Sequence, residues 1–249
     1  MIKNKTALAV STALFLTVET LLGIRFQVNA DYGAPLRYTT VILACLFCIL
    51  FARRSCEYLL TQLALIMTVC ADCFLVLPSQ PLQLPGMLFF VPVQLAYAAR
   101  LYLVEKAPNL RKWQIIARVL LSGVALIATV LVLGKSTDAV ALLSLLYYTN
   151  LILNVVFACG QFRKQRVLAL GLILFLCCDT VVGLSFLDGY FTVTQPSLLD
   201  RIIHPGFDLV WAFYLPSQML LAVSLLPAQW RVLAATNKPN TRQSERSLS

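Results

Sequence analysis

The sequence is poor in charge and has almost no histidine. Only 12% of its 249 residues are charged, whereas 59% are hydrophobic. A soluble domain usually carries about 25% charged residues, so this composition excludes an ordinary water-soluble fold. The single histidine, His204, excludes a zinc hydrolase site built from three histidines, and we expect no metal and no other cofactor.

Long apolar runs take the place of the missing charge. Backbone amides cannot stay unpaired in lipid, so a membrane-spanning chain forms helices or a closed barrel. The runs are continuously apolar, which excludes the alternating pattern of barrel strands. At about 20 residues per crossing, we predict an all-α, polytopic membrane helix bundle of about eight transmembrane helices. The predicted spans are residues 6–24, 38–51, 58–77, 84–103, 114–133, 139–159, 167–187 and 205–226.

The basic residues are distributed unequally between the loops on the two sides of the membrane. Only four of the twenty Lys and Arg residues lie in the loops of one side, namely Arg25, Arg37, Lys135 and Arg201. Arg118 lies in the fifth span, and the rest, including Arg100, lie on the other side. Cytoplasmic loops retain Lys and Arg, so we expect a multi-pass protein of the cell membrane with both termini cytoplasmic.

The domain organisation follows from the same runs. Residues 1–236 are predicted to form one transmembrane domain, and the polar segment 237–249 a disordered cytoplasmic tail. A cleaved signal peptide ending near Ala30 is an alternative, but Glu19 inside the first apolar run favours an uncleaved helix. The net charge of +9 is spread over loops, so we expect no nucleic-acid partner.

Two aspartates, Asp72 and Asp179, lie inside apolar runs. A carboxylate at membrane depth costs several kcal/mol, so both side chains, and that of Glu19, should face the bundle interior. Two neighbouring acids that share one proton can divide general-acid and general-base work, which makes both aspartates candidate catalytic residues. Alternatively, each aspartate only forms hydrogen bonds to a neighbouring helix.

The surroundings of the two aspartates echo each other. Each aspartate is followed, one span later, by a proline two residues before a glutamine: Pro92 and Gln94 in the fourth span, Pro216 and Gln218 in the eighth. A separation of four crossings keeps the orientation in the membrane, so the echo predicts a parallel 4+4 internal repeat with halves 1–105 and 112–236. Such a repeat would bring both aspartates toward one centre.

Further polar residues are spaced so that each pair shares one helix face. These candidate substrate-binding residues are Gln94 with Tyr97, Asn150 with Asn154, and Tyr214 with Gln218. Hydrogen bonds between helices explain each pair equally well when it is taken alone. Convergence of all three pairs with the aspartates would favour a ligand site.

The combined pattern resembles the YhhN-like lysoplasmalogenase family of multi-pass membrane proteins. The matching positions, which extend over nearly the whole chain, are Asp72, Gly86, Phe90, Gln94, Tyr97, Gly171, Asp179, Tyr214 and Gln218. The chain has Gln94 where the family usually has histidine. It has Ala71 and Cys178 where serine or glycine usually precedes the aspartates.

The resemblance implies hydrolysis of the vinyl ether bond of lysoplasmalogens, with Asp72 and Asp179 as the acid and the base. The implied partners are a lysophospholipid or another lipid-like small molecule, together with membrane lipids. Glutamine cannot carry a proton near neutral pH, so Gln94 could only form hydrogen bonds. Two alternatives remain open, a proton-coupled transporter of a small solute and a membrane scaffold or sensor without chemistry.

Overall fold

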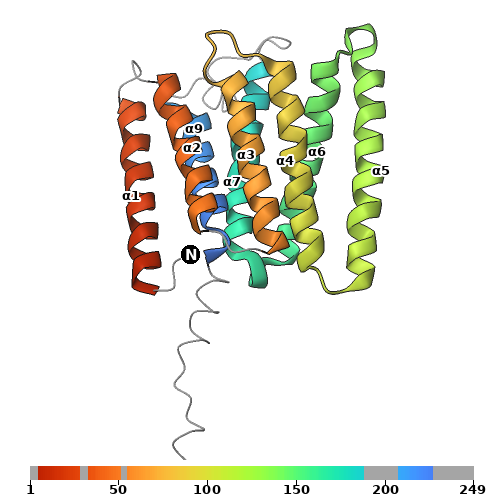
Figure 1. Ribbon diagram of the computed structural model, residues 1–249. Coiled ribbons are helices and arrows are strands. Elements are labelled where there is room, and N and C mark those ends of the chain that lie inside the picture. The colour runs from red at the N-terminus through yellow and green to blue at the C-terminus, as the bar shows by residue number, and fades with distance from the viewer. Residues whose placement is uncertain (1–4, 29–32, 52–54, 188–206, 227–249) are drawn as a thin grey trace, which may run out of the picture.

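The computed structural model describes residues 5–28, 33–51, 55–187 and 207–226. These residues form a bundle of upright helices and contain no strand (Figure 1), so the prediction of an all-α fold is confirmed. The predicted tail at 237–249, His204 and the predicted start of the last span at residue 205 lie outside the described residues.

The helices follow the apolar runs of the sequence. They are α1 (Lys5–Val28), α2 (Gly33–Phe51), α3 (Cys56–Leu75), α4 (Gln83–Val104), α5 (Pro108–Leu133), α6 (Ala139–Gly160), α7 (Phe162–Leu187) and α9 (Leu209–Val223), with a 3-10 turn η2 (Gly134–Ser136). The helices α1 to α7 are long and apolar enough to cross a membrane, whereas α9 has 15 residues. The chain is therefore an integral membrane protein.

Local signals in the sequence fix where several helices begin. Pro108 opens α5, where its missing N–H and fixed φ suit a first helical turn. Asp138 caps α6, because its carboxylate accepts a hydrogen bond from the Ala141 amide at 2.7 Å. Asp208 caps α9 in the same way through the Trp211 amide. This cap explains why the last helix begins at Leu209 within the described residues.

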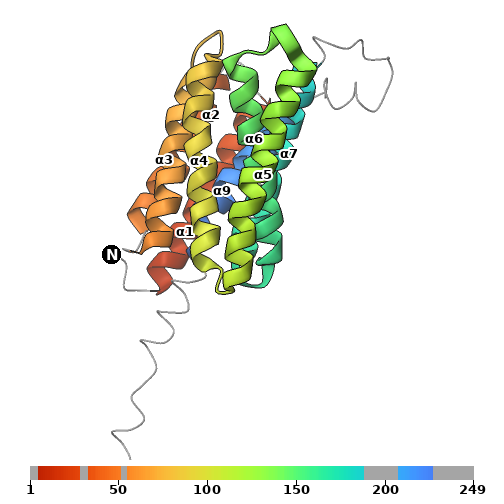
Figure 2. The ribbon, with the colours of Figure 1, turned by 90° about the vertical axis from the view of Figure 1, so that its right-hand side faces the viewer.

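Six helices form a closed ring in which each packs on the next: α2, α3, α4, α6, α7 and α9, which returns to α2. The two remaining helices lie at opposite edges of the bundle (Figure 1), where α1 packs on α2 and α9, and α5 packs on α6. Figure 2 shows α2 to α4 on one side and α5 to α7 on the other, with α9 visible between them. The polar interior is therefore enclosed mainly by the six ring helices.

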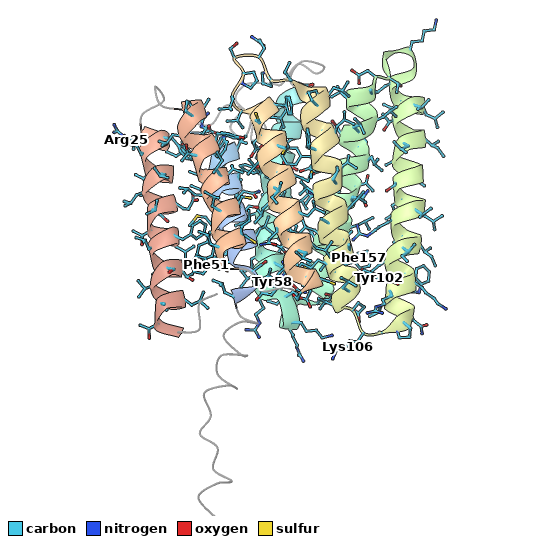
Figure 3. All side chains as sticks on the ribbon, viewed as in Figure 1. Arg25, Phe51, Tyr58, Tyr102, Lys106 and Phe157 are labelled. Atoms are coloured by element: carbon cyan, nitrogen blue, oxygen red, sulfur yellow. The ribbon has the colours of Figure 1, made fainter. Side chains whose placement is uncertain are left out.

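The helix α5 is the most lipid-exposed element. Its long apolar side chains point outward, and Val119, Leu131 and Val132 are 68%, 78% and 82% exposed. Side chains at the two ends of the bundle are more polar. Figure 3 shows Arg25 at one end and Tyr102 and Lys106 at the other. Apolar flanks between polar ends are the surface that a bilayer requires.

The helix contacts follow a two-fold pattern. The pair α3–α4 corresponds to α7–α9, α1–α2 to α5–α6, α2–α3 to α6–α7, and α4–α6 to α9–α2. A parallel 4+4 repeat would produce these correspondences. The repeat itself and the cytoplasmic location of both termini stay predictions.

The second helix is longer than its apolar run. It begins at Gly33 instead of residue 38, so Arg37 lies inside α2. The Arg37 guanidinium forms an ion pair with the carboxylate of Asp208, just before α9. Because the charge is paired between helices, the helix can continue past it toward its N-terminus.

Candidate functional site

Asp72 lies in α3, in the interior of the ring. Its side chain is 3% exposed, as the sequence predicted for an acid at membrane depth. The hydroxyl of Tyr214, on α9, donates a hydrogen bond to Asp72 Oδ2 at 2.6 Å. The structure thus brings together two predicted site residues that are 142 positions apart in the chain.

Asp179, in α7, has a tyrosine partner of its own. The hydroxyl of Tyr147, on α6, donates to Asp179 Oδ2, and Tyr147 is 5% exposed. Sequence reasoning missed Tyr147, although it lies three residues before Asn150 and thus on the same helix face. Each aspartate is therefore held by one buried tyrosine from another helix.

Two phenylalanine rings join these acid–tyrosine pairs. Phe175 lies 5.7 Å from Tyr214 and 6.1 Å from Phe90, measured between ring centroids. Phe90 in turn lies 5.4 Å from Tyr147. We call this group the acid–aromatic centre, and its members are Asp72, Tyr214, Phe175, Phe90, Tyr147 and Asp179.

The two predicted asparagines connect three helices. Asn154 Nδ2 donates to the side-chain oxygen and to the backbone carbonyl of Gln94, both at 2.9 Å. Arg118, on α5, donates to Asn154 Oδ1 at 2.7 Å and to Asn150 Oδ1 at 3.3 Å. Arg118 thus binds inside the bundle instead of reaching the membrane surface. These bonds tie α4, α5 and α6 together. Contact of the two asparagines with a substrate stays a prediction.

Three of the predicted polar residues keep unused hydrogen-bonding groups in the interior. Gln94 and Tyr97 are fully buried and Gln218 is 1% exposed. The Gln94 Nε2, the Tyr97 hydroxyl and both amide atoms of Gln218 have no hydrogen-bond partner within the described residues. Buried polar groups nearly always have partners. Water or a polar ligand would supply them here.

The comparison with known families decides the identity of the chain. The sequence profile of the YhhN family matches residues 34–225. The chain belongs to the YhhN family. No curated protein and no solved structure matches the sequence. All members of the acid–aromatic centre lie within the matched region, whereas α1 precedes it.

In this YhhN-family protein a second polar group of the interior is centred on a buried arginine near the C-terminal end of α4. Arg100, in α4, is 1% exposed, although the sequence placed it among the basic residues of a loop side. It donates to Thr61 Oγ1 at 3.0 Å, Ser224 Oγ at 2.7 Å and Gln165 Oε1 at 2.9 Å. Gln165 is the residue at which α7 kinks. One guanidinium therefore holds α3, α4, α7 and the end of α9.

Glu19, in α1, is a buried acid outside the region matched to the YhhN family. It is fully buried, and neither carboxyl oxygen has a hydrogen-bond partner among the described residues. Its interior position agrees with the expectation for an acid at membrane depth. In the described part of the chain, no three His, Cys, Asp or Glu side chains gather as metal ligands.

Proposed function

We propose that this YhhN-family protein hydrolyses the vinyl ether bond of lysoplasmalogens, with Asp72 and Asp179 as its acid and base. The observation that carries the proposal is the acid–aromatic centre, in which two acid–tyrosine pairs are linked by Phe90 and Phe175. Two carboxyls that flank a substrate support reactions that pass through an oxocarbenium ion.

The reaction begins with proton transfer to carbon. The neutral acid gives its proton to the outer alkene carbon, and the C=C electron pair forms that C–H bond. The ether oxygen stabilises the positive charge left on the neighbouring carbon. Aromatic faces attract cations, so the rings of Phe90 and Phe175 would stabilise this ion together with the ionised carboxylate.

Water then completes the hydrolysis. The second carboxylate takes a proton from a water molecule while the oxygen of that water bonds to the cationic carbon. The resulting hemiacetal gives its hydroxyl proton to the first carboxylate as its bond to the glycerol oxygen breaks. That oxygen takes the proton held by the second carboxyl and leaves as an alcohol. A fatty aldehyde and a glycerophospho head group remain, and the acid and base return to their starting forms with one water consumed.

Each tyrosine holds its carboxyl in a fixed rotamer through one hydrogen bond. The buried amide of Gln94 and the hydroxyl of Tyr97 provide unused polar groups for water or substrate. Gln94 carries no proton of its own, so the proton transfers of this mechanism fall to the two aspartates.

Substitution of the aspartates tests the proposal. Asp72→Asn and Asp179→Asn should each lower aldehyde release from lysoplasmalogen at least about a hundredfold, the lower end of what general acid–base catalysis contributes. Asp138→Asn is the matched control, because Asp138 only caps α6 and asparagine caps equally well. Full activity of either aspartate variant, or no aldehyde release by the unmodified protein, would contradict the proposal.

The second candidate function is proton-coupled transport of a small solute. Glu19 favours it, since its carboxyl is buried and has no partner within the described residues. Acids in membrane-spanning helices are typical of proton pathways. Uptake into proteoliposomes that depends on a pH gradient and is lost in Glu19→Gln would support transport. Aldehyde release without such uptake would support hydrolysis.

A further inference from the structure

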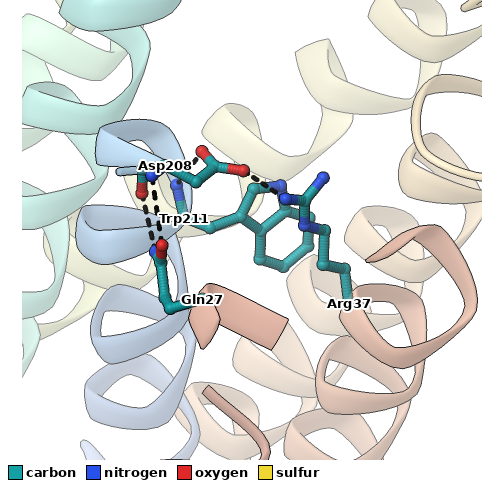
Figure 4. A network of polar contacts seen from close by, with 4 residues as sticks. All are labelled: Gln27, Arg37, Asp208 and Trp211. Carbon is teal, nitrogen blue, oxygen red and sulfur yellow. Dashed lines mark hydrogen bonds and ion pairs between the residues drawn. The ribbon is translucent and has the colours of Figure 1, made fainter. Parts of the chain in front are cut away.

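A polar cluster lies at the end of the bundle where α2 and α9 begin (Figure 4). Gln27 donates to the Asp208 carbonyl at 2.8 Å and accepts from the Asp208 amide at 3.1 Å. Asp208 Oδ1 accepts from the Trp211 amide at 3.2 Å. The backbone and one carboxylate oxygen of Asp208 are thus fixed, while its Oδ2 forms the ion pair with Arg37.

This ion pair is open to a ligand. The side chains of Arg37 and Asp208 are 25% and 27% exposed. A ligand that carries both an anion and a cation can replace their direct contact without leaving either charge unpaired. Arg37 Nε is buried and has no hydrogen-bond partner within the described residues. The guanidinium therefore keeps at least this one donor unused, and a guanidinium binds phosphate through such donors.

Aromatic rings line the same place. The Arg37 guanidinium carbon lies 5.7 Å from the ring centroids of both Phe26 and Trp211. Such rings also attract alkylammonium groups. A cation, an anion and two aromatic faces together match the chemistry of a zwitterion.

The cluster is connected to the acid–aromatic centre at a suitable distance. The Trp211 and Tyr214 rings are in edge contact at 5.0 Å, and Tyr214 donates to Asp72. Asp208 precedes Tyr214 by six residues, about 9 Å along a helix. An extended glycerophosphoethanolamine group can span this length between its ether oxygen and its ammonium nitrogen. A vinyl ether at Asp72 would thus bring its head group toward Arg37 and Asp208.

We propose that Arg37 and Asp208 form the head-group site for a zwitterionic lysophospholipid. Arg37 binds the phosphate diester, Asp208 binds the ammonium group, and the ligand takes the place of the direct ion pair. The placement of the vinyl ether at Asp72 rests on the proposed function. The recognition of the zwitterion rests on the cluster alone.

Binding of lipids that cannot be hydrolysed separates the two proposals. The probes are three saturated 1-alkyl ether lipids: an alkylglycerophosphoethanolamine, the alkylglycerophosphate without the amine, and the alkylglycerol without the phosphate. Equilibrium binding to the purified full chain in detergent should give affinity in that order. Inorganic phosphate at millimolar concentration should not compete, because a free anion lacks the alkyl chain that contributes most of the buried apolar area.

Each variant should change the affinity for a different subset of the three lipids. Arg37→Gln should weaken both phosphate-bearing lipids about tenfold or more, the loss of a charge-assisted hydrogen bond. Asp208→Asn keeps the α9 cap and should weaken only the ethanolamine lipid. Lys135→Gln removes an exposed cation that forms none of these contacts and should change neither. If Arg37→Gln does not fold, Arg37→Lys should lose affinity for both phosphate lipids by a smaller factor.

A pair that only clamps α2 to α9 predicts a different result. In that case Arg37→Gln and Asp208→Asn would lower the melting temperature and leave the order of affinities unchanged, which would overturn the head-group site. Competition by inorganic phosphate equal to that of the alkylglycerophosphate would overturn it as well, in favour of a free-anion site. If the order holds but no aldehyde is released from lysoplasmalogen, the head-group site stands and the hydrolase proposal fails.

Discussion

Tyr147 and Tyr148, adjacent residues of α6, have different partners, which allows a role in the reaction to be distinguished from a role in packing. Tyr147 donates to the carboxyl of Asp179, whereas the neighbouring Tyr148 hydroxyl lies 2.8 Å from Thr180 Oγ1. Both contacts join α6 to α7, and both involve one hydroxyl. Only the first has an acid as its partner.

Tyr147→Phe should therefore lower the turnover of lysoplasmalogen about ten- to hundredfold, the cost of a hydrogen bond to a charged group. The ring contact with Phe90 stays in this variant, so the melting temperature should change little. Tyr148→Phe is the matched control and should keep the turnover of the unmodified protein. Equal turnover in the two variants would remove Tyr147 from the centre's chemistry.

The same pair of tyrosines shows which parts of the site could be predicted from the sequence. Asp72 and Asp179 could be found because a charged residue in an apolar run must turn inward. Tyr147 and Tyr148 are both compatible with the run, and they point about 100° apart on a helix. The choice between them depends on how α6 packs on α7, which no local pattern encodes.

Arg118 and Arg100 were harder to place for a related reason. A basic residue near the end of an apolar run usually reaches the membrane surface. Here Arg118 binds Asn150 and Asn154, and Arg100 binds three neutral side chains. Their partners lie on other helices, so only the assembled bundle reveals them.

At the scale of the helices, close contact between α7 and α9 positions the two halves of the centre. Gly171, in α7, lies in close contact with α9, and its carbonyl accepts from Ser217 Oγ at 2.9 Å. A Cβ at Gly171 would lie 3.0 Å from the Leu221 side chain and 3.3 Å from Leu220 Cβ. Any larger side chain must push the helices apart.

Gly171→Leu should destabilise the folded protein by about 1–3 kcal/mol, the usual cost of overpacking. It should also lower hydrolysis, since Tyr214 would move away from Asp72. Gly123→Leu in α5 is the matched control, because a Cβ there meets no atom within 4 Å. Thermal unfolding in detergent measures the difference, and similar melting temperatures for the two variants would contradict the packing argument.

The boundaries of the helices mark the limit of hydropathy as a guide. The apolar runs located each α-helix in the described part of the chain, because lipid requires long apolar segments. The first turn of α2 was not predicted, because a charged residue such as Arg37 usually marks the end of a membrane span. Its ion pair with Asp208 allows the helix to begin earlier. The hydropathy of one segment does not indicate which polar contacts its helix forms with other helices.

At the scale of the whole molecule, the orientation in the membrane is the main open prediction. The bias of Lys and Arg predicts that both termini are cytoplasmic, which requires an even number of crossings. The described residues contain seven long helices, an odd number, so this prediction requires the short α9 to cross as the eighth.

Reporter fusions test this count. A fluorescent protein that folds only in the cytoplasm should be active when fused after Ser249 and also when fused before Met1. A phosphatase that is active only outside the cytoplasm should be inactive at both ends. Activity of the fluorescent protein at one end alone would show an odd number of crossings and would exclude α9 as a full span.

The long sequence separation between Asp72 and its tyrosine, 142 positions, has a consequence for biosynthesis. The ribosome delivers α3 to the bilayer long before α9 has been translated. Asp72 therefore lacks its final hydrogen bond until the chain has been made as far as Tyr214. Until then it must be tolerated by the insertion machinery or by water near the nascent helices. A chain released before residue 214 therefore keeps most of its crossings but lacks the phenol on which the arrangement of Asp72 depends.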